Sequence, residues 1–279
     1  RHSSKRPSSP ASTSSSPAGR RQGTRQLLNQ PSRGEPCEPA DASSNLNPPN
    51  SRYLVRSSMA KDFYELLLEN DNGEAAVSAV RSGLPVNSYD GNGFTPLYVA
   101  AMLGQTNVVD VLIAAGANVN LTSRDSGRGT PLHAAAQWGW KGVCQSLISA
   151  GASVRSADGV KATPLHNAAG MGFAGICQLL LDQGADVSAK NKFKGATPLQ
   201  VAVANGSHGK AESALREMER DLATEGFRFP PREPQDSVGT VALLLRQGIS
   251  RRDASKAATW ARLNGSDEMI RVLTFHGSR

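Results

Sequence analysis

Thr130-Pro131-Leu132-His133-Ala134-Ala135-Ala136 is the clearest copy of a phrase that recurs along this 279-residue chain. Three further copies begin at Thr95, Thr163 and Thr197, so that successive copies start 35, 33 and 34 residues apart. A nearly constant period of this length indicates a stack of similar units, none of which can bury its apolar face alone. The sequence therefore predicts a repeat architecture before any functional residue is considered.

Each residue type in the phrase suits the start of an α-helix. The Thr hydroxyl can accept a hydrogen bond from an unpaired amide of the first turn. Proline fits the next position, because the amide hydrogen that it lacks would have no partner there. A glycine, which favours a left-handed helix end, stands nine residues after each Thr: Gly104, Gly139, Gly172 and Gly206. We therefore predict a short helix between each Thr and its glycine.

A second apolar stripe follows each of these glycines. In one unit it consists of Val143, Cys144, Leu147 and Ile148, and this spacing is that of one helix face. The stripes of three units end at Gly116, Gly151 and Gly184. Each unit is thus predicted to be a pair of helices.

The repeated phrase resembles Thr-Pro-Leu-His-x-Ala, the signature of the ankyrin-repeat family. The resemblance implies an all-α fold, an ankyrin-repeat solenoid of stacked helix–turn–helix units with hairpin-like turn tips. It extends over residues 61–279 as about six units: 62–94 as an N-terminal cap, 95–129, 130–162, 163–196, 197–253, and 254–279 as a C-terminal cap. The two end units lack Thr-Pro-Leu and have more polar faces, as the ends of an array require.

The unit 197–253 is interrupted between its two helices. Gly206 is followed by a second helix only near Val241, so we interpret about residues 207–236 as an insertion. In the alternative, residues 207–226 are an ordinary second helix and the following unit lacks its first helix. The absence of another Thr-Pro-Leu phrase in this stretch favours the insertion.

Residues 1–60 have a different composition from the rest of the chain. They contain 14 serines, 8 of the 16 prolines and a net charge of +6 out of the total of +7. Such a segment buries too little apolar surface to offset its ordering entropy, so we predict a disordered basic tail. It is interpreted as a linker within a longer protein or, being rich in Arg and Ser, as part of an organellar transit peptide. Nucleic-acid binding is disfavoured because the tail holds one aromatic residue and no recognition motif.

No apolar stretch reaches the roughly 18 residues that a membrane span requires. The three cysteines, Cys37, Cys144 and Cys177, do not form the framework of a secreted disulfide-rich protein. We therefore expect an intracellular protein, cytoplasmic or nuclear, or one imported into an organelle if the tail is a transit peptide.

The residues that suggest chemistry fall on the repeat period. His133 and His166 occupy one position of successive units, and so do Cys144 and Cys177. The resemblance implies a structural histidine near the turn, and the cysteines are interpreted as small core residues. With no recurring nucleophile–base–acid set or metal-ligand cluster, we predict no enzyme activity, no cofactor and no metal site.

The resemblance implies that partners bind to the concave face and to the turn tips. Carried over to this chain, the candidate partner-binding residues are Met102, Leu103, Gln137, Trp138, Trp140, Lys161, Met171, Phe173, Lys192, Phe193 and Lys194. In one interpretation the large apolar members pack between repeats. In the other they form an exposed stripe, with Trp138 as its anchor and basic tips at its border, which suits an amphipathic or acidic segment of a partner protein.

The sequence therefore predicts a non-catalytic protein–protein interaction module. One alternative is a regulatory or targeting segment of a larger enzyme or channel. Another is a nucleic-acid-binding protein that uses its basic tail.

Overall fold

The computed structural model describes residues 73–206, 216, 220, 229–263 and 266–277. Within these ranges every regular element is a helix, and none is a strand. The tail 1–60, the start of the first unit and residues 207–215 of the insertion lie outside the described residues. The predictions made for those segments therefore stay predictions.

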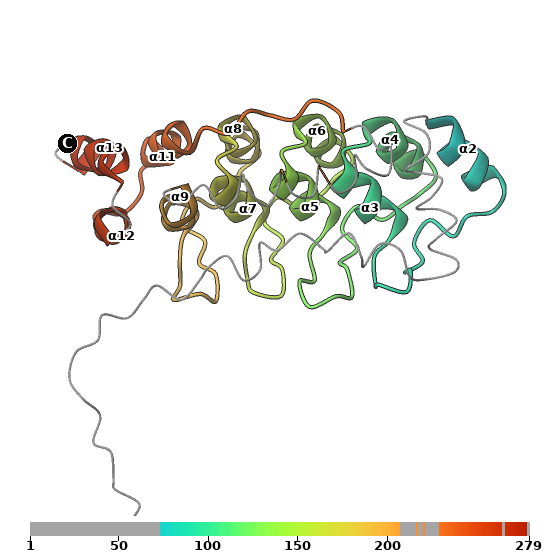
Figure 1. Ribbon diagram of the computed structural model, residues 1–279. Helices are drawn as coiled ribbons and strands as arrows, with labels where there is room; N and C mark the ends of the chain where they lie inside the picture. The colour runs from blue at the N-terminus through green and yellow to red at the C-terminus, as the bar shows by residue number, and fades with distance from the viewer. Residues whose placement is uncertain (1–72, 207–215, 217–219, 221–228, 264–265, 278–279) are drawn as a thin grey trace, which may run out of the picture. The chain divides into compact units, whose positions relative to one another are not determined.

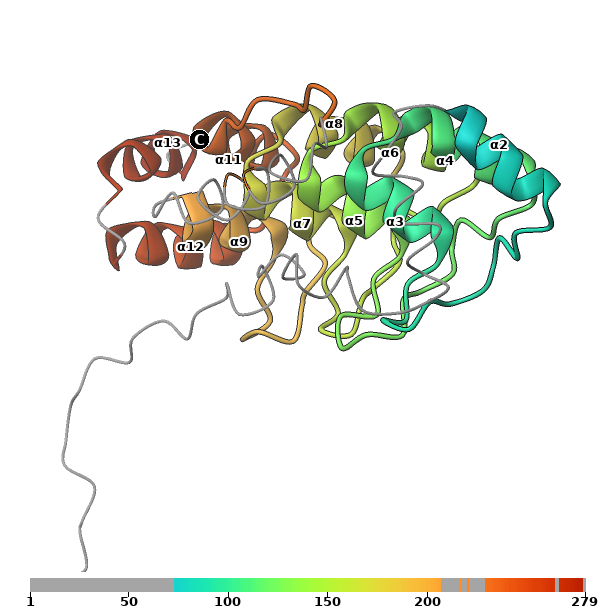
Figure 2. The same cartoon turned by 45° about the vertical axis from the view of Figure 1, so that its right-hand side comes forward.

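The helices form two rows, as Figures 1 and 2 show. The first row contains the helices that begin the units, namely α3 (Pro96–Leu103), α5 (Pro131–Trp138), α7 (Pro164–Met171), α9 (Pro198–Gly206) and α12 (Arg251–Leu263). The second row contains α2 (Gly73–Arg81), α4 (Thr106–Ala114), α6 (Lys141–Ser149), α8 (Ala174–Asp182), α11 (Ser237–Leu245) and α13 (Asp267–Gly277). Each helix packs on the next one in its row, and most also pack on their partner in the other row. The predicted fold, a solenoid of stacked helix pairs, is confirmed.

The predicted helix signals stand where the helices begin and end. Thr95, Thr130 and Thr163 precede α3, α5 and α7 in extended conformation, and each is followed by its proline. Gly139 ends α5 with a φ of 83°, in the left-handed region that glycine occupies without a steric penalty. Gly206 differs, because it lies within α9 as its last residue.

The core runs continuously from unit to unit. Leu97, Leu132, Leu165 and Leu199 have at most 1% of their surface exposed, and the alanine pairs that follow the first three are equally buried. Burying a leucine side chain stabilises the fold by about 1.5–3 kcal/mol. Small alanine side chains allow neighbouring first helices to approach closely, so the repeated Leu and Ala positions account for the stacking.

The interrupted unit is completed by α11, which packs on both α8 and α9. This is the place that a second helix of that unit would occupy, and the interpretation of 207–236 as an insertion stays a prediction. Residues 229–236, which we call the strap, run back across the ends of α6 and α8 before α11 begins (Figure 1, orange). Among the helices described, none is long and apolar enough to cross a membrane.

Candidate partner-binding surface

Six of the predicted partner-binding residues are core residues. None of them has more than 4% of its surface exposed: Met102, Leu103, Trp138, Trp140, Met171 and Phe173. The structure therefore agrees with the interpretation in which they pack between repeats and does not show an exposed apolar stripe anchored by Trp138. A binding role for these six side chains stays an untested prediction.

Trp140 and Phe173 show why these side chains are buried. The indole Nε1 of Trp140 donates to the backbone oxygen of Met102 in the preceding unit, at 2.8 Å. Its ring fills the space beside Gly104, where a Cβ would lie 2.6 Å from the ring carbon Cδ2. Phe173 stands in the same relation to Gly139, at 2.7 Å. Each ring thus occupies the space left by a missing side chain, and the sequence carried this signal because both aromatics directly follow a repeat glycine.

The remaining candidates lie on or near the accessible surface. Lys161, Lys192 and Lys194 are exposed, and Gln137 and Phe193 are partly buried. All but Gln137 belong to the turns that project from the array below the first row in Figure 1, which we call the tips. The structure thus leaves the basic tips, and not the apolar stripe, as the part of the predicted site that a partner can reach.

Three tips hold a basic residue in the left-handed backbone region. The φ angles are 48° for Arg128, 58° for Lys161 and 53° for Lys194. This conformation costs a residue with a Cβ about 1–2 kcal/mol. Arg128 was not among the predicted site residues, although it stands two residues before Thr130, as Gly93 stands before Thr95 and Lys161 before Thr163.

The acidic residues of the tips are used to build the turns. Oδ1 of Asp158 accepts from the amides of Val160 and Ala162, at 2.9 and 2.7 Å. Asp125 accepts in the same way from the amide of Arg128, at 3.1 Å. Side-chain acceptors of this kind replace backbone hydrogen bonds in tight turns. Burial raises the pKa of Asp158 despite these amides, so this acid is turned inward. The basic side chains of the tips are exposed, although Nζ of Lys192 donates to the backbone oxygen of Gly159 at 2.7 Å.

Backbone hydrogen bonds join each tip to the next and fix their spacing. The amide of Arg124 donates to the oxygen of Gly93 at 2.8 Å, and the amide of Gly159 donates to Gly127 at 2.8 Å. The guanidinium of Arg124 also lies 3.8 Å from the ring centre of Tyr89. The tips therefore form a hydrogen-bonded row, in which successive basic residues are separated by about the distance between units.

His133 and His166 have the structural role that the resemblance implied. Nδ1 of His133 accepts from the amide of Thr130 at 3.2 Å, and Nε2 lies 3.1 Å from the oxygen of Ala162 in the next unit. With the proton on Nε2, the ring donates to that oxygen. His166 repeats the arrangement with Thr163 and Ala196. Burial lowers the pKa of both rings to about 4, so they are neutral at physiological pH.

The two thiols in the described part of the chain show no sign of reactivity. Cys144 and Cys177 are free and fully buried. Burial, reinforced by the charge of Glu233, raises the pKa of both thiols and keeps them protonated. In the part of the chain that the structure describes, no group of three His, Cys, Asp or Glu side chains could hold a metal ion.

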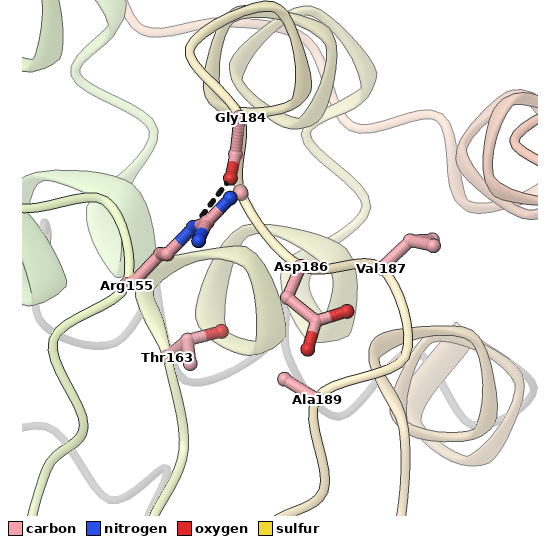
Figure 3. Close-up of a pocket in the computed structure, with 7 residues that line it drawn as sticks. Arg155, Thr163, Gly184, Asp186, Val187 and Ala189 are labelled. Carbon is pink, nitrogen blue, oxygen red and sulfur yellow. Dashed lines mark hydrogen bonds between the residues drawn. The ribbon is translucent and has the colours of Figure 1, made fainter.

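One pocket of about 480 Å³ is lined by residues of the segment 184–189, which follows α8, together with Arg155 and Thr163, and Figure 3 shows it. Its polar groups are engaged in the fold: Arg155 donates from Nε to the oxygen of Gly184 at 2.8 Å, and Thr163 Oγ1 lies 2.9 Å from Nδ1 of His166. Asp186 accepts from the amide and the hydroxyl of Ser188. The pocket therefore offers no convergent set of unengaged polar groups of the kind that orients a small-molecule ligand.

A comparison with protein families identifies the fold. The model described as "Ankyrin repeats (3 copies)" matches residues 65–158 and 142–221, which is more than half of the chain. The chain belongs to the ankyrin-repeat family. No curated protein matches it. Ankyrin-repeat domains are generally protein-binding and typically non-catalytic, and no enzyme family was detected in the chain.

Proposed function

We propose that the array binds an acidic segment of a partner protein through its basic tip row, formed by Arg128, Lys161, Lys192 and Lys194. The observation that carries this proposal is the left-handed backbone of three of the four. Glycine would be accommodated there without steric cost. Backbone strain of this kind is concentrated at functional sites, so the retained positive charge indicates a binding role.

The charge pattern of the tips supports an acidic partner. Asp125 and Asp158 accept hydrogen bonds from their own turns, whereas the four members of the basic tip row are exposed. Like charges that face solvent in a row attract a segment of opposite charge and increase its association rate. Phe193, which is partly buried beside Lys192 and Lys194, adds an apolar contact and suits an amphipathic segment.

The spacing of the tips suggests the pattern of the ligand. Stacked helices lie about 8–10 Å apart, and an extended chain advances about 3.3 Å per residue. An extended segment that runs along the tips would therefore meet one basic side chain with every third residue. The expected ligand has Asp or Glu at intervals of three residues.

The proposal is tested with the full chain and a labelled peptide that carries glutamate at every third position. Replacing Arg128, Lys161 and Lys194 together by glycine removes three charges and also removes the backbone strain, so folding is preserved. Three exposed ion pairs of about 0.5 kcal/mol each predict a roughly tenfold loss of affinity near 0.15 M salt. Fluorescence anisotropy measures this loss.

The matched control neutralises Arg246, Arg251 and Arg252, three exposed bases away from the tips. Replacing these by glutamine should leave affinity within a factor of about two, since remote surface charges are screened at this salt concentration. Equal losses in the two variants would mean that net charge alone attracts the peptide, and an unchanged affinity of the tip variant would exclude the basic tip row. Double-stranded DNA added as a competitor tests the nucleic-acid alternative.

A further inference from the structure

The strap lies on the side of the array that carries the turns between first and second helices. We call this side the turn edge; it is formed by the turns at Gly104, Gly139 and Gly172, together with the first turns of α6 and α8. In Figure 2 the same orange segment passes above α8 before it enters α11. The strap does not contribute to the basic tip row, so any binding at the turn edge concerns a separate surface.

The strap advances three residues for each unit of the array. Cγ of Pro230 lies 3.0 Å from the point where a Cβ of Gly104 would stand. The amide of Glu233 donates to the oxygen of Gly139 at 3.1 Å, and the amide of Asp236 donates to the oxygen of Gly172 at 2.7 Å. Three extended residues span about 10 Å, which matches the packing distance of neighbouring helices. The turn edge therefore presents equivalent acceptors at the period of an extended chain.

The turn edge also selects an acidic side chain. Trp140 and Phe173 stand at the N-cap positions of α6 and α8, and neither side chain caps the amides of its helix's first turn. Oε1 of Glu233 accepts instead from the amide of Gly175 in the first turn of α8. A carboxylate at a helix N-terminus is favoured by the helix dipole and by the unpaired amides there. The Nζ atom of Lys141 lies beside the same point, 2.9 Å from where a Cβ of Gly175 would stand.

The strap also makes an aromatic contact, four residues before Glu233. The ring of Phe229 stacks on that of Trp140 with 5.9 Å between centroids and 8° between planes. The guanidinium of Arg232 lies 5.1 Å from the same tryptophan ring. Prolines at 230, 231 and 234 favour an extended backbone, which lowers the entropy lost when such a segment binds. The pattern that the turn edge recognises is an aromatic residue, a proline, two variable residues and a glutamate.

The strap itself fits imperfectly. Within the described part of the chain, Oε2 of Glu233 and Nε2 of Gln235 are buried without a hydrogen-bond partner. A buried polar atom that lacks a partner costs about 1–3 kcal/mol. A segment with the same anchors but better-paired polar groups would therefore compete with the strap for the turn edge.

We propose that the turn edge is a second peptide-binding site, occupied in the free protein by the chain's own strap. Its external ligand is an extended partner segment of the pattern aromatic-Pro-x-x-Glu. Such a segment displaces the strap, places its aromatic ring on Trp140 and its carboxylate on the amide of Gly175, and donates backbone hydrogen bonds to the oxygens of Gly139 and Gly172.

The test uses a labelled peptide of residues 229–238, Phe-Pro-Pro-Arg-Glu-Pro-Gln-Asp-Ser-Val, and the full chain. In one variant Phe229→Ala and Glu233→Ala weaken the strap and leave the turn edge intact. Anisotropy should show saturable binding to this variant that is at least tenfold tighter than to the unaltered chain, where the tethered strap competes at an effective concentration of about millimolar. A peptide with Gln in place of Glu should bind more weakly.

Two glycines provide a matched pair for the turn edge. They hold the second position of α8 and α6, where alanine is about 1 kcal/mol more favourable for a helix, so both variants should fold. Gly175→Ala places a methyl group 2.7 Å from the position of Glu233 Oε1, whereas a Cβ at Gly142 meets only Thr106 Oγ1 at 3.4 Å. Added to the weakened-strap variant, Gly175→Ala should reduce peptide affinity at least tenfold, and Gly142→Ala should leave it unchanged.

Three outcomes would overturn the proposal. The first is a folded weakened-strap variant that shows no saturable binding, and the second is binding that Gly175→Ala does not reduce. The third is concentration-dependent dimerisation in sedimentation velocity with exchange of straps between copies, which would assign the turn edge to a second copy of this chain. None of these results concerns the basic tip row, so the two proposals are tested independently of each other.

Discussion

The turn edge and the tips both need left-handed backbone, yet they use different residues for it. At the turn edge the positions are Gly104, Gly139 and Gly172, with φ angles of 77–83°. A Cβ at the first two would lie within 3 Å of an aromatic ring of the next unit. At three tips the residue is Arg or Lys, whose side chain is exposed. A positive φ alone therefore does not force glycine, whereas a positive φ with a close neighbour does.

The largest effect is expected for Gly139→Ala. Its Cβ would lie 2.7 Å from Phe173 Cζ at a φ of 83°, so backbone strain and overpacking both act. Together they should lower the free energy of unfolding by roughly 3 kcal/mol. The matched control is Gly151→Ala, which has a φ of 88° and no atom within 4 Å of its Cβ. For this variant the free energy of unfolding should fall by only about 1 kcal/mol. Urea unfolding followed by circular dichroism measures both, and equal losses would contradict the distinction between the two edges.

A smaller effect is expected from pH, because histidines anchor the chain where each tip returns to the stack. The pKa of His133 and His166 is lowered by burial from 6.5 to about 4 in the folded state. Between these values the unfolded chain binds protons that the folded chain does not. The contribution of the two neutral histidines to the free energy of unfolding is therefore fully present above pH 6.5 and is lost as the pH falls toward 4. The loss is about 2 kcal/mol per histidine at pH 5.

Gln200 supplies the control for this prediction. Its Oε1 accepts from the amide of Thr197 at 3.1 Å and its Nε2 donates to the oxygen of Asp253 at 3.4 Å. It therefore makes both backbone contacts of the histidines without titrating, although Thr197 Oγ1 is left unpaired. The variant with His133→Gln and His166→Gln should therefore unfold with a much flatter pH dependence between pH 7 and 5. Parallel curves for this variant and the unaltered chain would exclude the histidines as the origin of the acid sensitivity.

The smallest effect is expected for Lys161→Gly. Relief of the strain at a φ of 58° is offset in part by the greater flexibility of glycine in the unfolded chain. The variant should gain at most about 1 kcal/mol in unfolding free energy. Differential scanning calorimetry would show a slightly raised midpoint. A clear loss of stability would mean that the lysine is retained for the fold and would remove the main argument for the basic tip row.

The sequence was sufficient for the helix pairs because their signals are local. Thr95, its proline and Gly104 mark the start and the end of one helix within ten residues. The burial of Trp138 did not follow from the sequence, since its position on the helix face suits both packing and binding. The strap contacts join residues that lie far apart in the sequence, such as Glu233 and Gly139, and no periodic pattern in the sequence predicts them. The left-handed backbone at Arg128 could have been predicted from the sequence, because an alignment of the units places Arg128 at the position of Gly93.

The strap also changes how the array deforms. In a stack held by neighbouring contacts alone, each junction bends independently, and small angles accumulate along the length. The strap has backbone anchors at Gly139 and Gly172 and a close contact at Gly104, so it acts as a tether of nearly constant length along one edge. That edge resists extension because one continuous segment spans three units, whereas the units at the tips are joined by separate contacts between neighbours. The compliance of the array is therefore anisotropic, and its softest bending motion spreads the tips apart.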